Sequence, residues 1–479
     1  MALLLGLTSV PLAFLLGHLS GDGLAIEWSS FGPTLAFAIG GAAVATATGG
    51  AIGTLSSIRS FPGRRALFVV SVVPIAAPPA FWWIGATRMT SAWGNASGPG
   101  PAAVVAGLAL SPVPLMLVVA ALRQMPSNLY QAARVALPPS LRFRSVLLPL
   151  LGAPLAGGFV LTVILLLGES ELPFLFGFRT VMTDVVTTFS QTFDVGKTVP
   201  LVIPLLLAIL ALGFIAGRPI MRTVLTASRG SQGVVRTPAS AILTLCAAAP
   251  AVCLLVSVGG YGWAIIRAVP AGWPRVSIDA STIVASIVEP VGCAWSALII
   301  TLFAVYPARR SRAMAVFLWF ALLLFCVPAA IYAIGWLGVG QILGGLSIPP
   351  GVAHTSRAVA LATLGFAVGY ARLPTSLEDA AALVRVSAVR RAFVFVLPVI
   401  VWSLMAASAL VAALTYADRD VASLLLPPGA SRLTLNLYLA SANAPSATVG
   451  MLAFVVLAGA AVTVILAATG PALLWGRRD

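Results

Sequence analysis

The sequence predicts an all-α polytopic membrane protein with about twelve transmembrane helices. Hydrophobic residues make up 60% of the 479 positions, charged residues only 9%, and the mean hydropathy of +1.04 is far above that of a soluble chain. The apolar residues form continuous runs instead of alternating with polar ones, which favours helices over barrel strands. Most of the chain is therefore expected to face a lipid bilayer.

Twelve apolar runs, each close to the roughly 20 residues that a membrane-crossing helix needs, follow one another along the chain. Their expected positions are 2–19, 34–57, 66–86, 102–121, 147–168, 198–217, 238–258, 281–306, 314–336, 355–371, 395–415 and 447–470. The first run is expected to be a retained helix; a signal peptide is the alternative, but no charged segment and no A-x-A site accompany it. Prolines are expected to kink the third and ninth runs; these are Pro74, Pro78, Pro79 and Pro328.

Basic residues are distributed unevenly between alternate loops. With the amino terminus inside, 20 of the 28 belong to the inside set and eight, Arg357 among them, belong to the outside set. This bias agrees with the positive-inside rule and places both termini in the cytoplasm. The net charge of +15 is therefore explained by basic residues that fix the orientation of the chain in the membrane, and no nucleic-acid partner is expected.

The four cysteines lie in expected spans without a CxxC pair, and the two histidines do not cluster. Apolar packing is the expected role of these cysteines. No metal site, disulfide framework or cofactor is indicated.

Three landmarks recur at a constant offset of 249 residues, which indicates an internal repeat. The pairs are Pro79-Ala80 with Pro328-Ala329, Leu148-Pro149 with Leu397-Pro398, and Glu169-Ser170-Glu171 with Asp418-Arg419-Asp420. Six spans in each half would make the two halves parallel. The expected division is a first half at 1–217 (core about 30–217), a basic cytoplasmic linker at 218–237 and a second half at 238–479 (core about 275–479).

In each half the longest inside loop precedes the Leu-Pro pair and carries an Ala-Ala pair at matching positions, Ala132-Ala133 and Ala381-Ala382. Small residues let a short helix approach another protein closely, and flanking arginines can pair with acidic groups. The alternative is that such a pattern is ordinary in an Ala- and Arg-rich chain.

These loops resemble the Glu-Ala-Ala loop of ABC importer permeases, which also has a glycine shortly after and a Leu-Pro pair near its end. In the second loop Asp379, Ala380 and Ala381 match the Glu-Ala-Ala positions and Arg385 replaces the glycine. The first loop is a poorer match, with Gln131, Ala132, Ala133 and Arg134 at its start and Leu148-Pro149 one residue early. Residues 30–85 resemble the start of the family's permease domain, and 418–438 resemble the tail of fused ferric-iron permeases.

The resemblance implies the ABC importer permease fold and a transport subunit in the bacterial inner membrane. No GxxxxGK[ST] phosphate loop is present, so ATP hydrolysis is expected in a partner and not in this chain. The implied partners are a homodimer of ATP-binding subunits, which dock on the two loops, and an extracytoplasmic solute-binding protein. Fused permeases of this kind serve ferric iron, thiamine or phosphonate, and the tail at 418–438 favours ferric iron.

Acidic residues are the candidates for the solute pathway or a gate. Glu169, Glu171, Asp418 and Asp420 are related by the repeat and could surround one opening, although Arg419 would weaken a simple cation site. Ordinary solvated loop ends are the alternative. Glu289 lies within an expected span, where a charge is costly and often functional, or it lies near the outer headgroups.

Two other classes remain open. A secondary transporter of the major facilitator type also has twelve spans in two parallel halves, but the loops at 58–66 and 307–313 lack the acid of its signature. A lipid-linked glycosyltransferase would need a catalytic acid pair in a large outside loop, and only Asp418 and Asp420 hint at one.

Overall fold

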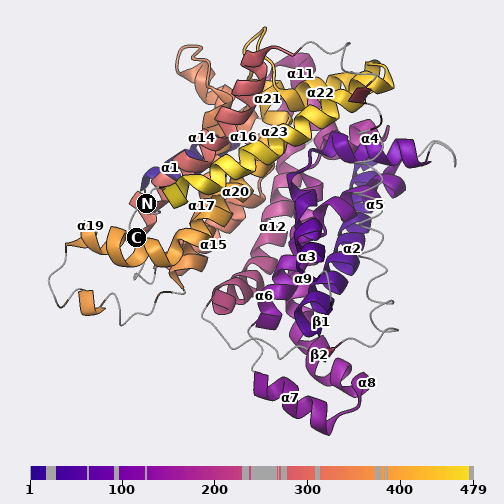
Figure 1. Cartoon of the computed structure of the whole chain (residues 1–479). Coiled ribbons are helices and arrows are strands. Elements are labelled where there is room, and N and C mark those ends of the chain that lie inside the picture. The colour runs from indigo at the N-terminus through magenta and orange to yellow at the C-terminus, as the bar shows by residue number, and fades with distance from the viewer. Residues whose placement is uncertain are drawn as a thin grey trace.

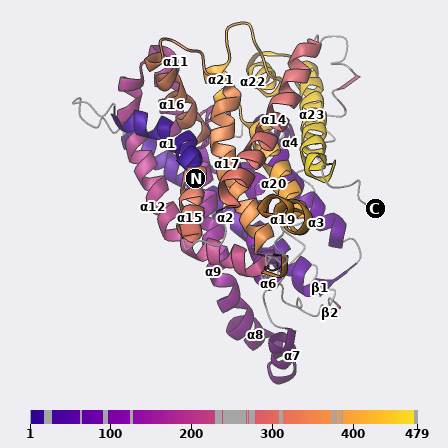
Figure 2. The same ribbon diagram turned by 90° about the vertical axis from the view of Figure 1, so that its left-hand side faces the viewer.

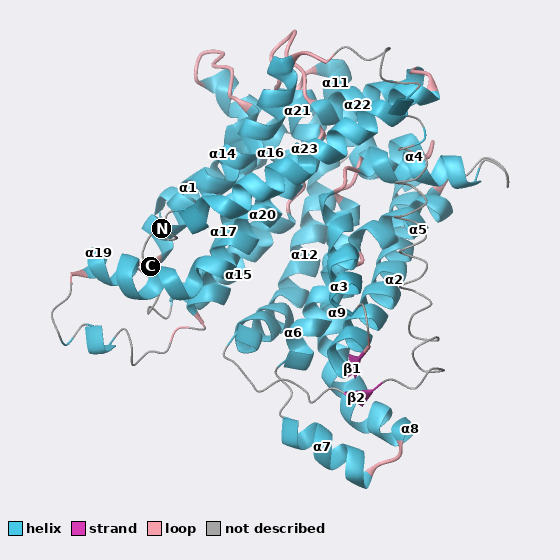
Figure 3. Cartoon of the chain, in the orientation of Figure 1, coloured by secondary structure: helices cyan, strands magenta, loops and turns pink. Residues whose placement is uncertain are grey.

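The computed structural model of the chain describes residues 2–17, 28–61, 64–90, 97–123, 127–228, 237–238, 267, 269–270, 278–307, 313–371, 373, 379–381, 383 and 387–473. Helices account for nearly all of them, and the two short strands are the exception (Figure 3). The predicted all-α polytopic class is confirmed.

The part of the chain before residue 239 contains twelve α-helices, two strands and two short irregular turns within the described ranges. They are α1 (Ala2–Gly17), α2 (Trp28–Ile58), β1 (Arg59–Ser60), α3 (Arg64–Val72), η1 (Val73–Ala76), α4 (Pro79–Thr90), α5 (Pro99–Leu110), α6 (Pro112–Arg123), α7 (Ser127–Ala136), α8 (Pro139–Arg142), η2 (Phe143–Leu147), α9 (Leu148–Leu167), α10 (Glu171–Leu175), α11 (Val181–Thr192), α12 (Val195–Ser228) and β2 (Thr237–Pro238). The strands β1 and β2 pair in parallel.

The remaining elements repeat much of this order. They are α14 (Ala280–Val305), α15 (Ala313–Cys326), α16 (Ala329–Ile342), α17 (Pro350–Tyr370), α19 (Ala388–Arg391), η4 (Ala392–Val396), α20 (Leu397–Ala417), α21 (Asp420–Leu425), α22 (Leu433–Asn443) and α23 (Ser446–Leu473). The elements α8, η2, α9 and α10 begin 249 residues before α19, η4, α20 and α21, respectively. Both η2 and η4 are five-residue π-helical turns.

Six helices among the described residues are long and apolar enough to cross a membrane. They are Trp28–Ile58, Ser140–Leu167, Val195–Ile215, Ala280–Val305, Ala392–Ala417 and Ala447–Thr469. Two bent helix pairs bring this number to eight if each pair is one span. The count of twelve stays a prediction, because the span expected at 238–258 lies almost wholly outside the described residues.

Three expected spans are broken instead of continuous. Residues 66–86 divide into α3, η1 and α4, and residues 314–336 divide into α15 and α16, which meet at 93°. Pro78, Pro79 and Pro328 lie at these breaks, since a proline has no backbone N–H and disfavours helix in the preceding residue. The third break, a bend of 41° between α5 and α6 at Ser111, was not expected.

Helix α1 packs mainly against α16 and thus against elements far away in the sequence (Figure 2). The contact is close, because a Cβ on Gly335 would lie 2.6 Å from the Pro11 carbonyl oxygen. Helix α12 extends to Ser228, so the beginning of the expected linker at 218–237 is helical. Residues 229–236 lie outside the described part of the chain.

The loop elements lie at opposite ends of the helix bundle (Figure 1). Helices α11, α21 and α22 are at one end, α7 and α8 are at the other, and α19 lies at the edge of the bundle, well apart from α7 and α8 (Figures 1 and 2).

Candidate solute pathway and coupling loops

A cavity of about 320 Å³ lies where the two repeated sets of helices meet. Residues of α5, α6 and α9 line one side and residues of α15, α17 and α20 line the other. Most of the wall is aliphatic, with Leu110, Leu117, Leu161, Leu361 and Leu414 among its members. The charged side chains of the wall are Glu169, Glu171, Arg357, Asp418, Arg419 and Asp420.

The four repeat-related acids, which the sequence singles out, thus lie together at one cavity. Glu169 and Asp418 occupy equivalent places, each ahead of a short helix. Glu169 Oε1 accepts hydrogen bonds from the backbone N–H groups of Glu171 (2.9 Å) and Leu172 (3.2 Å), and Asp418 Oδ1 accepts one from Val421 (3.2 Å). Carboxylates cap helix N-termini well, which explains why an acid stands at both positions.

Glu171 joins its short helix α10 to the start of α4. Its Oε1 accepts a hydrogen bond from the backbone N–H of Ala80 (3.1 Å), next to the break at Pro79. The side chain is 5% exposed. The carboxyl group therefore has a structural partner as well as a place in the cavity wall.

Asp420 and Arg419 connect the two acidic triplets. Asp420 accepts hydrogen bonds from Ser170 Oγ (2.7 Å) and Arg419 Nη2 (2.6 Å), and Arg419 Nη2 also donates to Ser170 Oγ (3.2 Å). The Arg419 guanidinium lies 4.0 Å from the centroid of the Tyr438 ring. Gly168, just ahead of the first triplet, packs closely on Pro328, since a Cβ there would lie 2.7 Å from Pro328 Cγ.

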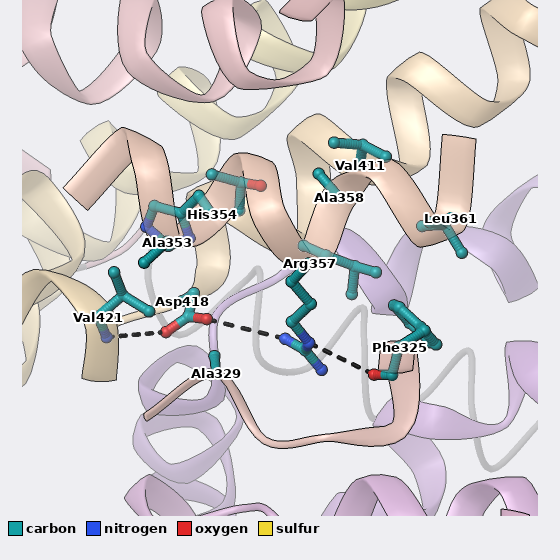
Figure 4. A pocket seen from close by; sticks show the side chains of 12 residues that line it. Phe325, Ala329, Ala353, His354, Arg357, Ala358, Leu361, Val411, Asp418 and Val421 are labelled. Carbon is teal, nitrogen blue, oxygen red and sulfur yellow. Dashed lines mark hydrogen bonds and ion pairs between the residues drawn. The ribbon is translucent and has the colours of Figure 1, made fainter. Parts of the chain in front are cut away.

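Arg357 is a cavity residue that the sequence analysis placed in the outside set of basic residues. It lies within α17, and its Nη1 is 3.9 Å from Asp418 Oδ2 while its Nε donates to the carbonyl oxygen of Phe325 at 3.5 Å (Figure 4). The sequence signal that could have found it is a single charge near the start of the apolar run 355–371.

Burial raises the pKa values of three cavity carboxyls. The pKa of Glu171 rises to about 8 and that of Glu169 to about 7, where the charge of Asp420 adds to the effect of burial. The pKa of Asp418 rises to about 6 for the same two reasons, opposed by Arg357. Near neutral pH the two glutamates therefore hold protons for much of the time.

Glu289 lies on α14 and does not line the central cavity. It accepts hydrogen bonds from Arg432 Nη2 (2.5 Å) and Nε (2.9 Å), and its Oε1 is 3.9 Å from His354 Nε2. These groups line a small cavity of about 20 Å³ that also reaches Asp418. Glu289 is thus in an ion pair that holds α14 to the start of α22.

The first loop residues named by the sequence lie on α7 and at the start of α9. Gln131, Ala132 and Arg134 are exposed, Ala133 is buried, and Leu148 and Pro149 are exposed.

The second loop is described in part. Asp379 and Ala380 are exposed, Ala381 is 5% exposed, and Leu397 and Pro398 begin α20 half-buried. Arg385 lies outside the described residues. The described residues of both loops thus include an exposed small side chain, Ala132 in the first and Ala380 in the second.

The bundle of long apolar helices, with breaks and with charged side chains in a mainly aliphatic cavity between repeated elements, defines an α-helical multi-pass membrane protein. Residues 45–218 match the family of binding-protein-dependent transport system inner membrane components. The match spans from α2 to α12, including the first loop, and supports an ABC transporter permease subunit that associates with ATP-binding subunits. No curated protein and no solved structure matches the chain.

Proposed function

We propose that the chain is the complete permease of a binding-protein-dependent ABC importer, with both permease halves in one polypeptide. The observation that carries the proposal is the recurrence, outside the matched residues 45–218, of the elements that follow the first loop. The sequence α19, η4, α20 and α21 repeats α8, η2, α9 and α10 with the same spacing. The halves are 1–217 and 238–479, joined by 218–237.

In this proposal the two loops are the docking sites for a homodimer of ATP-binding subunits. Exposed small residues at Ala132 and Ala380 leave room for close contact with a partner surface. The loops, the linker and both termini face the cytoplasm, and the end with α11 and α22 faces the solute-binding protein. Closure of the ATP-binding subunits would move the loops together and separate the helices around the cavity.

Ferric iron is the first substrate to test, because residues 418–438 resemble the tail of fused ferric-iron permeases. The test uses proteoliposomes that contain the chain and the ATP-binding subunits encoded beside it, with ATP on the loop side and the solute-binding protein on the other. We expect uptake of ⁵⁵Fe, supplied as ferric citrate, that requires both ATP and the binding protein.

Two other outcomes would change the proposal. If the binding protein stimulates ATP hydrolysis but no iron enters, the importer assignment holds and the iron assignment is wrong. If uptake needs an ion gradient and no ATP, the chain is a secondary transporter and the importer assignment is wrong.

A further inference from the structure

We propose that the central cavity binds a small solute carrying an oxyanion group, carboxylate or phosphate, and that Arg357 is the side chain that recognises this group. The inference rests on the proposed transport function in one respect, namely that the cavity lies on the path of the transported solute. It concerns a residue of α17 that neither the family match nor the loop pattern identifies.

Arg357 has donor capacity that its described surroundings do not use. A guanidinium has five N–H donors, and the polar contacts of Arg357 with described residues are a weak hydrogen bond to Phe325 O (3.5 Å) and an ion pair with Asp418 at 3.9 Å. The second contact is too long for a hydrogen bond. A half-buried cation in this state gains from any ligand that accepts two parallel hydrogen bonds, as carboxylate and phosphate do.

Both arginines of the wall lie over an aromatic ring, Arg357 over Phe325 at 5.2 Å, but Arg419 makes shorter polar contacts. It donates to Asp420 through Nε (3.2 Å) and Nη2 (2.6 Å), donates to Ser170 and stacks on Tyr438. It is 7% exposed, whereas Arg357 is 22% exposed and lines both the central cavity and a smaller neighbouring one. Because Arg357 is the more exposed of the two and its contacts are longer, it is the better placed to donate hydrogen bonds to a solute.

The charge balance of the wall also suits an anion. Asp418 and Asp420 are paired with Arg357 and Arg419, and at neutral pH burial keeps a proton on Glu171 for most of the time and on Glu169 for about half of the time. The two glutamates then repel an anion little, and their O–H groups can donate to it. Aliphatic neighbours such as Leu361 and Leu414 would pack on the rest of an organic solute.

The same wall is poorly suited to a bare metal ion. Within the described ranges, no group of three or more His, Cys, Asp or Glu side chains is placed to hold one. Iron bound to citrate, by contrast, presents carboxylate oxygens that Arg357 could recognise.

The experiment measures equilibrium binding of radiolabelled phosphate, citrate and ferric citrate to the purified full chain in detergent micelles. We expect at least one of these probes to bind to the wild-type chain. Its affinity for Arg357→Gln should be about tenfold lower or weaker still, because a pair of charge-assisted hydrogen bonds is lost. Arg357→Lys keeps the positive charge but loses the two parallel N–H donors of the guanidinium, so its affinity should lie between those of wild type and Arg357→Gln. Lys197→Gln removes an exposed positive charge from α12 and should bind as wild type.

A second variant distinguishes the loss of a binding group from misfolding of Arg357→Gln. Leu361→Trp fills the cavity one helical turn from Arg357 and leaves the arginine in place, so it should also weaken citrate binding. The proposal is wrong if wild type binds none of the probes at millimolar concentration, or if binding survives Arg357→Gln. Since the assay uses the chain alone, its result is independent of whether ATP-binding subunits associate.

Discussion

At the residue scale, the two acidic triplets have equivalent positions but different partners. Glu169 and Asp418 both cap a short helix, whereas Glu171 binds the backbone at Ala80 and Asp420 binds Ser170 and Arg419. The repeat therefore places the two triplets at equivalent positions, and single amino-acid differences between the two copies make the cavity asymmetric. Leu108 and Ser170 stand where the second copy has Arg357 and Arg419.

The raised pKa of Glu171 predicts a pH-dependent cost to stability. The carboxyl ionises near its ordinary pKa of 4.5 when unfolded but near 8 when folded, so the native state loses stability as pH rises between these values. Glu171→Gln imitates the protonated form and can still accept from Ala80. We expect the variant to melt at a higher temperature than wild type at pH 8.5 and at the same temperature near pH 4.5, measured by intrinsic fluorescence. An equal difference at both pH values would show that Glu171 is not the titrating group.

Ser170 joins the two triplets, so its hydroxyl should contribute measurably to stability. Ser170→Ala removes hydrogen bonds to both Asp420 and Arg419 and leaves these buried groups with one partner fewer, a cost of about 1–3 kcal/mol. The measurement is the free energy of unfolding in detergent. Ser423→Ala is the matched control, because this exposed hydroxyl donates only to the backbone of Asp420. Equal losses in the two variants would contradict the account.

At the element scale, helix breaks and glycines shape the bundle around the cavity. The bend at Ser111 is covered by Gly49 of α2, whose Cβ would collide with the Ser111 carbonyl oxygen, and by Gly158 of α9, whose Cβ would lie 2.7 Å from Pro114. The bend is possible because Pro112 and Pro114 follow it closely, and it opens α5 and α6 toward the cavity.

Gly49→Ala should therefore destabilise the protein by about 1–3 kcal/mol, because the backbones at Gly49 and at Ser111 cannot move apart without displacing their helices. Gly152→Ala on α9 is the control, since a Cβ there meets nothing within 4 Å and alanine favours helix. Thermal unfolding of both variants tests the prediction. A Gly49→Ala protein as stable as Gly152→Ala would show that α2 does not pack tightly on the bend.

Hydropathy predicted the continuous helices well and the broken ones poorly. The runs that became α2, α9, α14, α20 and α23 are long and uninterrupted, so length and composition were sufficient. The bend at Ser111 and the cavity depend on contacts between distant segments, which composition does not contain.

The site shows the same limit. The acids were found because they repeat, while Arg357 was missed because a charge near the start of an apolar run resembles a loop residue.

At the scale of the whole molecule, two repeated sets of elements meet at a central cavity, and the helices of both loops lie away from α11 and α22 (Figure 1). Helix α1 extends across to α16 and ties the start of the chain to the second set. This arrangement lets a movement of the loops reach the cavity walls, since α9 and α20 begin at the loops and end at the acidic triplets.

The central claim is that these loops couple the chain to separate ATP-binding subunits. Ala132 and Ala380 are exposed, whereas Ala381 is buried, so the informative variant is Ala132→Arg/Ala380→Arg, with Ala132→Ser/Ala380→Ser as the control. The measurement is copurification of the ATP-binding subunits encoded beside the chain, together with ATPase activity. The account predicts that wild type and the serine variant retain the ATPase, while the arginine variant enters the membrane at the same level and loses it. If wild type brings down no ATPase, or the arginine variant retains it, the coupling role of these loops is contradicted.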